Sequence, residues 1–236
     1  GSRLVSEVVR RLIGVWMDDL MAQTRRNLAE AAPQSAADAR AAGRAPARLD
    51  PTRFFAGAVV TNFKRHENEV MPQLYKMEQK LAAGARFLIN QIGYDARKIH
   101  ELRAWLQRRG HGHVPLIGNV YVLNPAVARV FRAQRIPGVV IADELAALCE
   151  RHAASPDKGK AFFLELAAKQ VAIYRGLGYR GAYLGGVHTA AEVQRVLAIA
   201  RGFAPDDWKQ FARELRYSRP GGFFVFAGES ARGKEC

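Results

Sequence analysis

The sequence lacks the cysteine pattern of a disulfide-built or metal-binding scaffold. Only two of its 236 residues are cysteine, Cys149 and Cys236, and their spacing matches no metal-ligand motif. Such sparse cysteine usage is typical of proteins in a reducing compartment, and we predict a cytoplasmic location. We expect Cys149 to serve as a small buried apolar residue on a helix.

Long apolar runs are also missing. No stretch of about 18 uncharged apolar residues occurs, so we predict no transmembrane helix and no membrane partner. The N-terminus lacks the ordered basic, apolar and small-residue regions of a secretory signal peptide. The chain begins with Gly-Ser rather than Met, which we interpret as the start of a processed or truncated chain.

Acidic residues are scarce relative to basic ones. The chain has 36 lysines and arginines against 22 aspartates and glutamates, which gives a formal net charge of +14. A basic domain raises the question of nucleic-acid binding, but no recognition motif and no basic stretch interleaved with aromatics occurs, so we do not expect nucleic acid as a partner. The charge is either a solvated surface or the binding site of a small anionic ligand.

The chain changes character near residue 52. Residues 3–30 carry apolar side chains at three- and four-residue steps, which predicts an amphipathic helix. Residues 31–52 are mostly Ala, Arg, Pro and Gly, which predicts a linker or an exposed loop. We therefore divide the chain into an N-terminal helix with a linker, residues 1–52, and a folded portion, residues 53–236.

Four compact apolar runs in the folded portion predict strands, and helical patterns connect them. Continuous apolar strands joined by helices are typical of a parallel sheet or barrel that is covered on both faces, so we predict the α/β class. The predicted strands are 54–60, 86–92, 114–123 and 181–186. The predicted helices are 62–83, 96–109, 124–134, 141–152, 158–178, 189–202 and 206–215.

Polar residues follow each predicted strand at its carboxyl end, where (β/α) barrels bind their ligands. Gln91 raises the sharpest question, because an amide at the end of an apolar strand costs free energy unless something bonds it. Its partner is either the protein's own backbone or a ligand. No glycine fingerprint of a Rossmann dinucleotide site follows any strand. The polar set is Thr61, Asn62, Lys64, Gln91, Tyr94, Asn119, Tyr121, Asn124, Gly185, Gly186 and His188.

Five segments, in order and spacing, resemble the methylenetetrahydrofolate reductase family. They are FFAGAVVTNFKRHE, KLAAGARFLINQIGYD, VPLIGNVYVL, PGVVIADEL and GLGYRGAYLGG, within residues 53–226. The match is to the carboxyl-terminal half of that family's (β/α) barrel, a TIM-like fold. It implies a flavoprotein oxidoreductase of one-carbon metabolism and methionine biosynthesis. Such an enzyme uses FAD to carry hydride from NAD(P)H to methylenetetrahydrofolate.

The resemblance also implies roles for particular residues, and it implies no metal. Gln91 would hydrogen-bond the pterin ring of the folate substrate and serve as the catalytic residue. The residues implied at FAD are Ala58, Val60, Lys64 and Lys80. The residues implied at the substrate, besides Gln91, are Asn119, Tyr121, Asn124 and His188.

The first half of the family's barrel has no counterpart in residues 1–52, which keeps an alternative open. The chain could be a non-catalytic folate- or flavin-binding module, or a subunit whose barrel another chain completes. Four parallel strands cannot close a barrel, and they leave edge strands and an apolar face exposed. We therefore expect a homo-oligomer, a complementary barrel half, or cover by the helix predicted over residues 3–30.

Two acidic positions are interpreted as helix starts. Asp95 is predicted to cap the helix over 96–109, because its carboxylate can accept the free N–H groups of the first turn. Asp143 and Glu144 resemble a paired-carboxylate site, but acidic residues at the start of a helix are expected from its dipole alone.

Overall fold

The computed structural model describes residues 41, 43, 55–133, 136 and 138–226. The chain divides into two units, Gly1–Phe55 and Ala56–Cys236, and the second carries the fold that follows. The helix predicted over residues 3–30 lies outside the described residues, as does the linker predicted over 31–52 except for Ala41 and Gly43.

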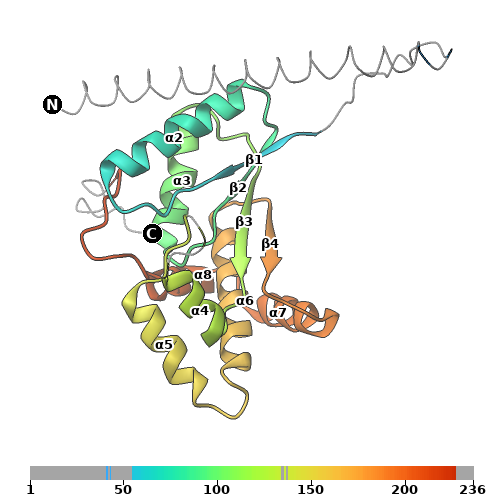
Figure 1. Cartoon of the computed structure of the whole chain (residues 1–236), viewed down its shortest axis with the longest axis vertical. Coiled ribbons are helices and arrows are strands. Elements are labelled where there is room, and N and C mark those ends of the chain that lie inside the picture. The colour runs from blue at the N-terminus through green and yellow to red at the C-terminus, as the bar shows by residue number, and fades with distance from the viewer. Residues whose placement is uncertain (1–40, 42, 44–54, 134–135, 137, 227–236) are drawn as a thin grey trace. The chain divides into compact units, whose positions relative to one another are not determined.

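The second unit is built from four strands and seven helices in its described part (Figure 1). The strands are β1 (Gly57–Val60), β2 (Phe87–Asn90), β3 (Leu116–Tyr121) and β4 (Gly181–Gly185). The helices are α2 (Glu67–Ala82), α3 (Ala96–Arg108), α4 (Pro125–Arg132), α5 (Asp143–Ala153), α6 (Lys160–Gly176), α7 (Ala190–Gly202) and α8 (Asp207–Glu214). Every strand and helix predicted for residues 53–236 is therefore confirmed, most of them with shorter ends.

Side-chain caps define several helix starts. The Asp95 carboxylate accepts the N–H of Arg97 at 2.9 Å, which confirms the predicted cap of α3. Asn124 Oδ1 accepts the N–H of Val127 at 2.9 Å at the start of α4. The largest boundary error is at α2, which begins at Glu67 rather than Asn62 because residues 61–66 form a loop after β1.

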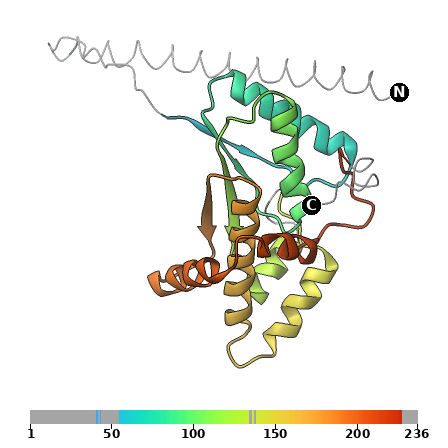
Figure 2. The same ribbon diagram turned by 180° about the vertical axis from the view of Figure 1, so that it is seen from behind.

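The four strands form one parallel sheet in the order β1-β2-β3-β4. In a sheet that grows in one direction, right-handed crossovers place all connecting helices on the same face. The strands lie in front of α3 and α6 in Figure 1, and the view from behind places these helices in front (Figure 2). The side chains of Val60, Leu88, Leu116 and Val120 are buried on this covered face.

The opposite face of the sheet, here called the open face, is not covered by the described residues. The strand register places Val59, Ile89 and Ile117 in one row of this face, and Tyr183 follows in the next row. Val59 is 51% exposed and Tyr183 is 59% exposed. The expectation that both faces are covered is therefore wrong for the described chain. The α/β class and the parallel sheet are confirmed, whereas a closed TIM barrel is not shown.

A buried contact between α6 and the sheet organises the core. Tyr174 is fully buried, and a Cβ on Gly118 of β3 would lie 2.3 Å from its ring, so only glycine permits this approach. The Tyr174 hydroxyl accepts a hydrogen bond from Asn90 Nδ2 at 2.8 Å. Asn90 therefore satisfies its amide inside the core at the carboxyl end of β2.

Two predictions from composition can be compared with the described residues. Cys149 is free and fully buried on α5, as predicted, and burial raises the pKa of its thiol to about 11. No helix within the described ranges is long and apolar enough to cross a membrane.

Candidate functional site

The carboxyl ends of the strands meet at one edge of the sheet, because all four strands are parallel. Asn62 and Gln91 follow β1 and β2, while Tyr121 and Gly185 end β3 and β4. The polar set that the sequence predicts at strand ends is therefore gathered on one side of the fold. Its side chains, however, do not all turn toward one cavity.

A pocket of about 270 Å³ lies at this edge, beside β1 and β2. Its walls come from the loop after β1, the start of α3, the segment before α5, and the irregular segment after α8. This last segment, residues 216–226, is here called the strap. The lining residues are Phe63, Lys64, Arg65, Glu69, Tyr94, Lys98, Ile136, Gly138, Val139, Val140, Tyr217, Ser218, Arg219 and Gly222.

The charges around the pocket are mainly positive. Lysine and arginine contribute four side chains to the lining, and Glu69 is the single carboxylate among the described lining residues. Glu69 Oε2 accepts the N–H of His66 at 3.1 Å, and Oε1 lies 3.9 Å from Lys64 Nζ. The hydrogen bond from His66 is the main cause that lowers the pKa of Glu69, so this carboxylate stays ionised at neutral pH. The basic members are Lys64, Arg65, Lys98 and Arg219.

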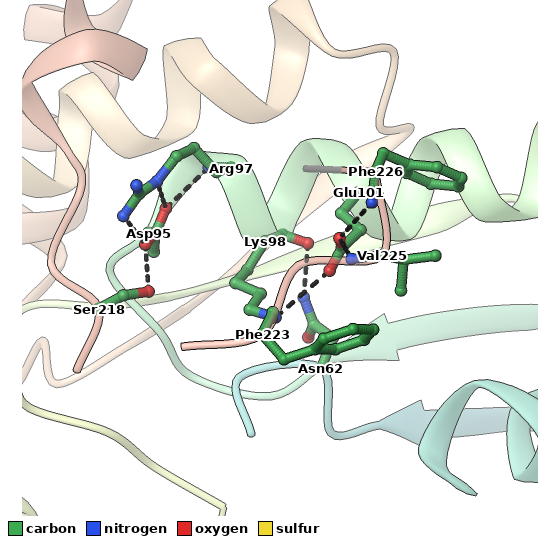
Figure 3. Close-up of polar contacts among 9 residues, drawn as sticks. All are labelled: Asn62, Asp95, Arg97, Lys98, Glu101, Ser218, Phe223, Val225 and Phe226. Atoms are coloured by element: carbon green, nitrogen blue, oxygen red, sulfur yellow. Dashed lines mark hydrogen bonds and ion pairs between the residues drawn. The ribbon is translucent and has the colours of Figure 1, made fainter. Parts of the chain in front are cut away.

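The strap is attached to α3 by a row of polar contacts (Figure 3). Ser218 donates a hydrogen bond to the carboxylate of Asp95, which also binds the guanidinium of Arg97 at 2.7 Å. Lys98 Nζ donates to the carbonyl of Phe223. Glu101 Oε1 accepts the N–H groups of Val225 and Phe226 at the end of the strap.

Lys98 and Glu101 form a buried ion pair between α3 and the strap. Their side chains are 2% and 8% exposed, and Lys98 Nζ lies 3.3 Å from Glu101 Oε2. Burial is the main cause that lowers the pKa of Lys98 and raises the pKa of Glu101, and each charge opposes the shift of the other. The partner and the strap backbone supply bonds that offset part of the cost of burying each group.

The residues implied at FAD by the resemblance are not brought together. Lys64 lines the pocket, whereas Ala58 and Val60 turn toward the helix-covered face of the sheet. Lys80 Nζ donates to the carbonyl of Val59 at 2.5 Å. This carbonyl lies on the outer edge of β1, because Ala56 and Val60 direct theirs to β2. Burial is the main cause that lowers the pKa of Lys80.

The residues implied at the substrate make mostly internal contacts. Gln91 Oε1 accepts the N–H of Ile92 at 2.9 Å, so a backbone group bonds the oxygen of this amide. Asn124 caps α4, and Tyr121 packs edge-on against Phe131 at 5.2 Å between ring centres.

Two further residues implied at the substrate lie near β3 and β4. The backbone N–H of His188 donates to Glu192 at 2.7 Å, and the His188 side chain is exposed. Asn119 lies beside Tyr183 on the open face, and its Oδ1 is buried with no hydrogen-bond partner within the described chain. An unsatisfied buried acceptor is costly, and the described contacts do not compensate this one.

Most pocket residues were not predicted from the sequence, among them Arg65, Lys98, Tyr217 and Arg219. Arg65 directly follows Lys64, and this basic pair was the only local signal. Lys98 looked like an ordinary polar position of an amphipathic helix. Tyr217 and Arg219 lie far along the chain from the strand ends, and no local pattern connects them to the pocket.

Metal binding has no support in the described residues. Within residues 55–133 and 138–226, no three or more His, Cys, Asp or Glu side chains are grouped so that they could hold a metal ion.

Comparison with known proteins gives one partial similarity. No protein-family model matches the chain. A deoxyguanosinetriphosphate triphosphohydrolase-like protein of Parvibaculum lavamentivorans is 54% identical over 43 residues. The similarity covers 18% of this chain and 11% of the length of that relative.

These comparisons overturn the resemblance to methylenetetrahydrofolate reductase. That family should have produced a matching model over most of residues 53–226, and none matches. The named relative is hydrolase-like, so the predicted flavin oxidoreductase of folate metabolism is also wrong. The five segments that suggested it are apolar strands followed by polar loops and helices, a pattern that parallel α/β proteins share.

Proposed function

We propose that this chain is a non-catalytic module that binds a small anionic ligand in the pocket beside β1 and β2. The observation that carries the proposal is the convergence of the basic side chains of Lys64, Arg65 and Arg219 on one cavity. Lys98 also lines the cavity but is paired with Glu101, and the single carboxylate of the described lining is already bonded. A hydrogen bond between a cation and an anionic oxygen is about twice as strong as a neutral one. A phosphate or carboxylate is the group that such a lining favours.

The rest of the lining favours a ring beside the anion. Phe63, Tyr94 and Tyr217 supply aromatic surface, and aliphatic side chains complete the apolar part. A planar ring that carries a phosphate or carboxylate meets both requirements, as in a flavin nucleotide, a folate or a nucleoside triphosphate. The last of these also corresponds to the name of the partly similar protein, a deoxyguanosinetriphosphate triphosphohydrolase-like protein. FAD and NAD(P)H as cofactors stay predictions.

Binding without catalysis is proposed because the candidate reactive groups of the described lining are already engaged. The Ser218 hydroxyl donates to Asp95, which itself bonds Arg97. Glu69 is held by the backbone of His66. Asp95 is the carboxylate next to Ser218, but it also accepts the backbone N–H and the guanidinium of Arg97, which makes it a poor base for the hydroxyl.

Removal of single charges tests the pocket. Replacement of Arg65 or Lys64 by Gln is expected to weaken ligand binding about tenfold each, because each change removes one charge-assisted hydrogen bond. The measurement is calorimetric titration of the full chain with pyrophosphate, FMN, folate and dGTP, which separates phosphate from carboxylate ligands. Higher salt should weaken binding in parallel, because both side chains are partly exposed.

Arg129→Gln is the matched control, since Arg129 is an exposed arginine of α4 that pairs with Glu150 away from the pocket. It should bind like the wild type. The proposal fails if none of the four ligands binds, or if Arg65→Gln and Arg129→Gln have the same affinity.

The open face supports a second candidate, a subunit that packs its sheet against another copy of the chain. The open-face side chains of the four strands carry no charge, and several are apolar and half-exposed. Parallel sheets occur almost only with both faces covered. Lys80 protects the outer edge of β1, so the proposed contact is face to face.

A charge placed on the open face tests this association. Tyr183→Arg should shift the wild-type dimer toward monomer, because the contact would then bury an unpaired charge. Analytical ultracentrifugation at about micromolar to tens of micromolar protein measures the shift, which should exceed about tenfold in dissociation constant. Tyr183→Phe is the control and should dimerise as the wild type does. A wild type that is monomeric throughout this range contradicts the candidate.

A further inference from the structure

The strap contributes one wall of the pocket and is also the segment that α3 holds. Tyr217, Ser218 and Arg219 line the pocket, and the next few residues reach α3. The strap contains no helix or strand, and its one bridge joins Arg216 to Asp95. Its position therefore depends on the contacts that anchor it rather than on its own secondary structure.

The anchors are of two kinds. Backbone groups of the strap bond Lys98 and Glu101, and the N–H of Phe223 donates to the carbonyl of Arg65 at 2.7 Å. Arg65 also lines the pocket, so one residue belongs to both the ligand site and the strap anchor.

Aromatic rings supply the second kind of anchor. The ring of Phe224 lies 4.7 Å from the guanidinium of Arg97 and 4.3 Å from Lys98 Nζ. The ring of Phe226 lies 4.2 Å from the guanidinium of Arg108. Neither phenylalanine lines the pocket, and Phe224 reaches it only through Lys98, which Glu101 still holds when the ring is removed. The anchor can therefore be weakened with little change to the ligand site.

The geometry points to a coupling between ligand binding and strap docking, which rests on the proposed anion site. The ligand lies between Lys64 and Arg65 on the loop after β1 and Arg219 on the strap. Only the docked strap brings Arg219 to this position. An anion therefore favours the docked strap. When the strap leaves α3, Arg219 is removed from the anion site.

Thermodynamic linkage makes this coupling reciprocal. A ligand that binds only the docked form stabilises that form in proportion to its occupancy. A change that undocks the strap must lower the apparent affinity for the ligand, in proportion to the fraction of molecules that remain docked. Both sides of the relation can be measured on the same full-length chain.

The test compares the wild type with Phe224→Ala/Phe226→Ala. Hydrogen exchange of the Phe223 and Val225 amides reports strap docking, and calorimetry with pyrophosphate reports binding. Pyrophosphate at about a hundred times its Kd should slow wild-type exchange at these amides by up to about a hundredfold. The double variant loses the cation–π contacts and should bind pyrophosphate at least about fivefold more weakly.

Phe162→Ala is the matched control, because Phe162 stacks on His152 at 3.6 Å in another part of the fold. It should leave both readouts unchanged. Exchange of the β3 amides shows in the same spectra that the variants are folded, and Phe224→Ala alone replaces the double variant if they are not.

The outcomes separate the coupling from the ligand site itself. Pyrophosphate that binds the wild type while strap exchange and the affinity of the variant stay unchanged overturns the coupling alone. If the wild type binds neither pyrophosphate nor the other probes, the proposed function is contradicted, and so is the coupling that rests on it.

Discussion

Lys98→Met is expected to lower the free energy of unfolding by about 3–5 kcal/mol. The substitution removes a cation from a site that is 2% exposed and leaves the Glu101 carboxylate buried without its ionic partner. It also removes the donor to the Phe223 carbonyl in the strap. Urea unfolding of the full chain, followed by circular dichroism, measures the loss.

The double replacement Lys98→Met/Glu101→Leu is the decisive comparison. Replacement of a whole buried ion pair by apolar residues is often neutral or stabilising, whereas removal of one partner is not. The double variant should therefore be more stable than Lys98→Met, although it still leaves the strap N–H groups of Val225 and Phe226 without Glu101. A loss below about 1 kcal/mol in Lys98→Met would mean that water reaches the pair.

Tyr174→Ala is expected to cost about 3–5 kcal/mol, which is typical for removal of a buried aromatic side chain. The ring fills the space left by Gly118 between α6 and β3, and its hydroxyl bonds Asn90. The truncation creates a cavity between α6 and the sheet. It also leaves the side-chain amide of Asn90 with one hydrogen-bond partner fewer. Chemical unfolding under the same conditions as for Lys98→Met gives the value.

Tyr174→Phe separates packing from hydrogen bonding. The ring stays in place, so the loss should fall to about 1 kcal/mol, the net contribution of one hydrogen bond. Equal losses in the two variants would show that the hydroxyl, rather than the ring, holds α6 on the sheet.

The fold of the second unit was largely predictable because its signals are local. Each strand is one compact apolar run, and the helices have periodic apolar faces, several with a capping residue such as Asp95 or Asn124. These patterns arise within about ten residues of chain. The open face was foreseen only from the number of strands, because four parallel strands cannot close a barrel. The strands themselves do not reveal it, because a run of continuous apolar residues looks the same whether one or both of its faces are covered.

The site was predicted only in part, because its chemistry depends on contacts between distant segments. The sequence directed attention to the strand ends, and Lys64 does line the pocket. The polar residues that looked most like ligand groups, Gln91 and Asn124, bond backbone N–H groups nearby. A short polar residue can bind its own chain as readily as a ligand, and sequence alone does not separate these uses.

The order in which the chain acquires its structure follows from where the strap attaches. Neighbouring strands of the sheet are consecutive in sequence, and even the connection from β3 to β4, which carries α4, α5 and α6, closes a shorter loop than the strap does. The bond between Lys98 and Phe223 joins residues 125 positions apart. The entropic cost of closing a loop grows with the length of the loop. We therefore expect this contact to form after the sheet has assembled, when the folded sheet has already shortened the loop that remains to be closed. The strap is then the last segment to fold and the first to leave in local unfolding, well before the sheet itself loses protection.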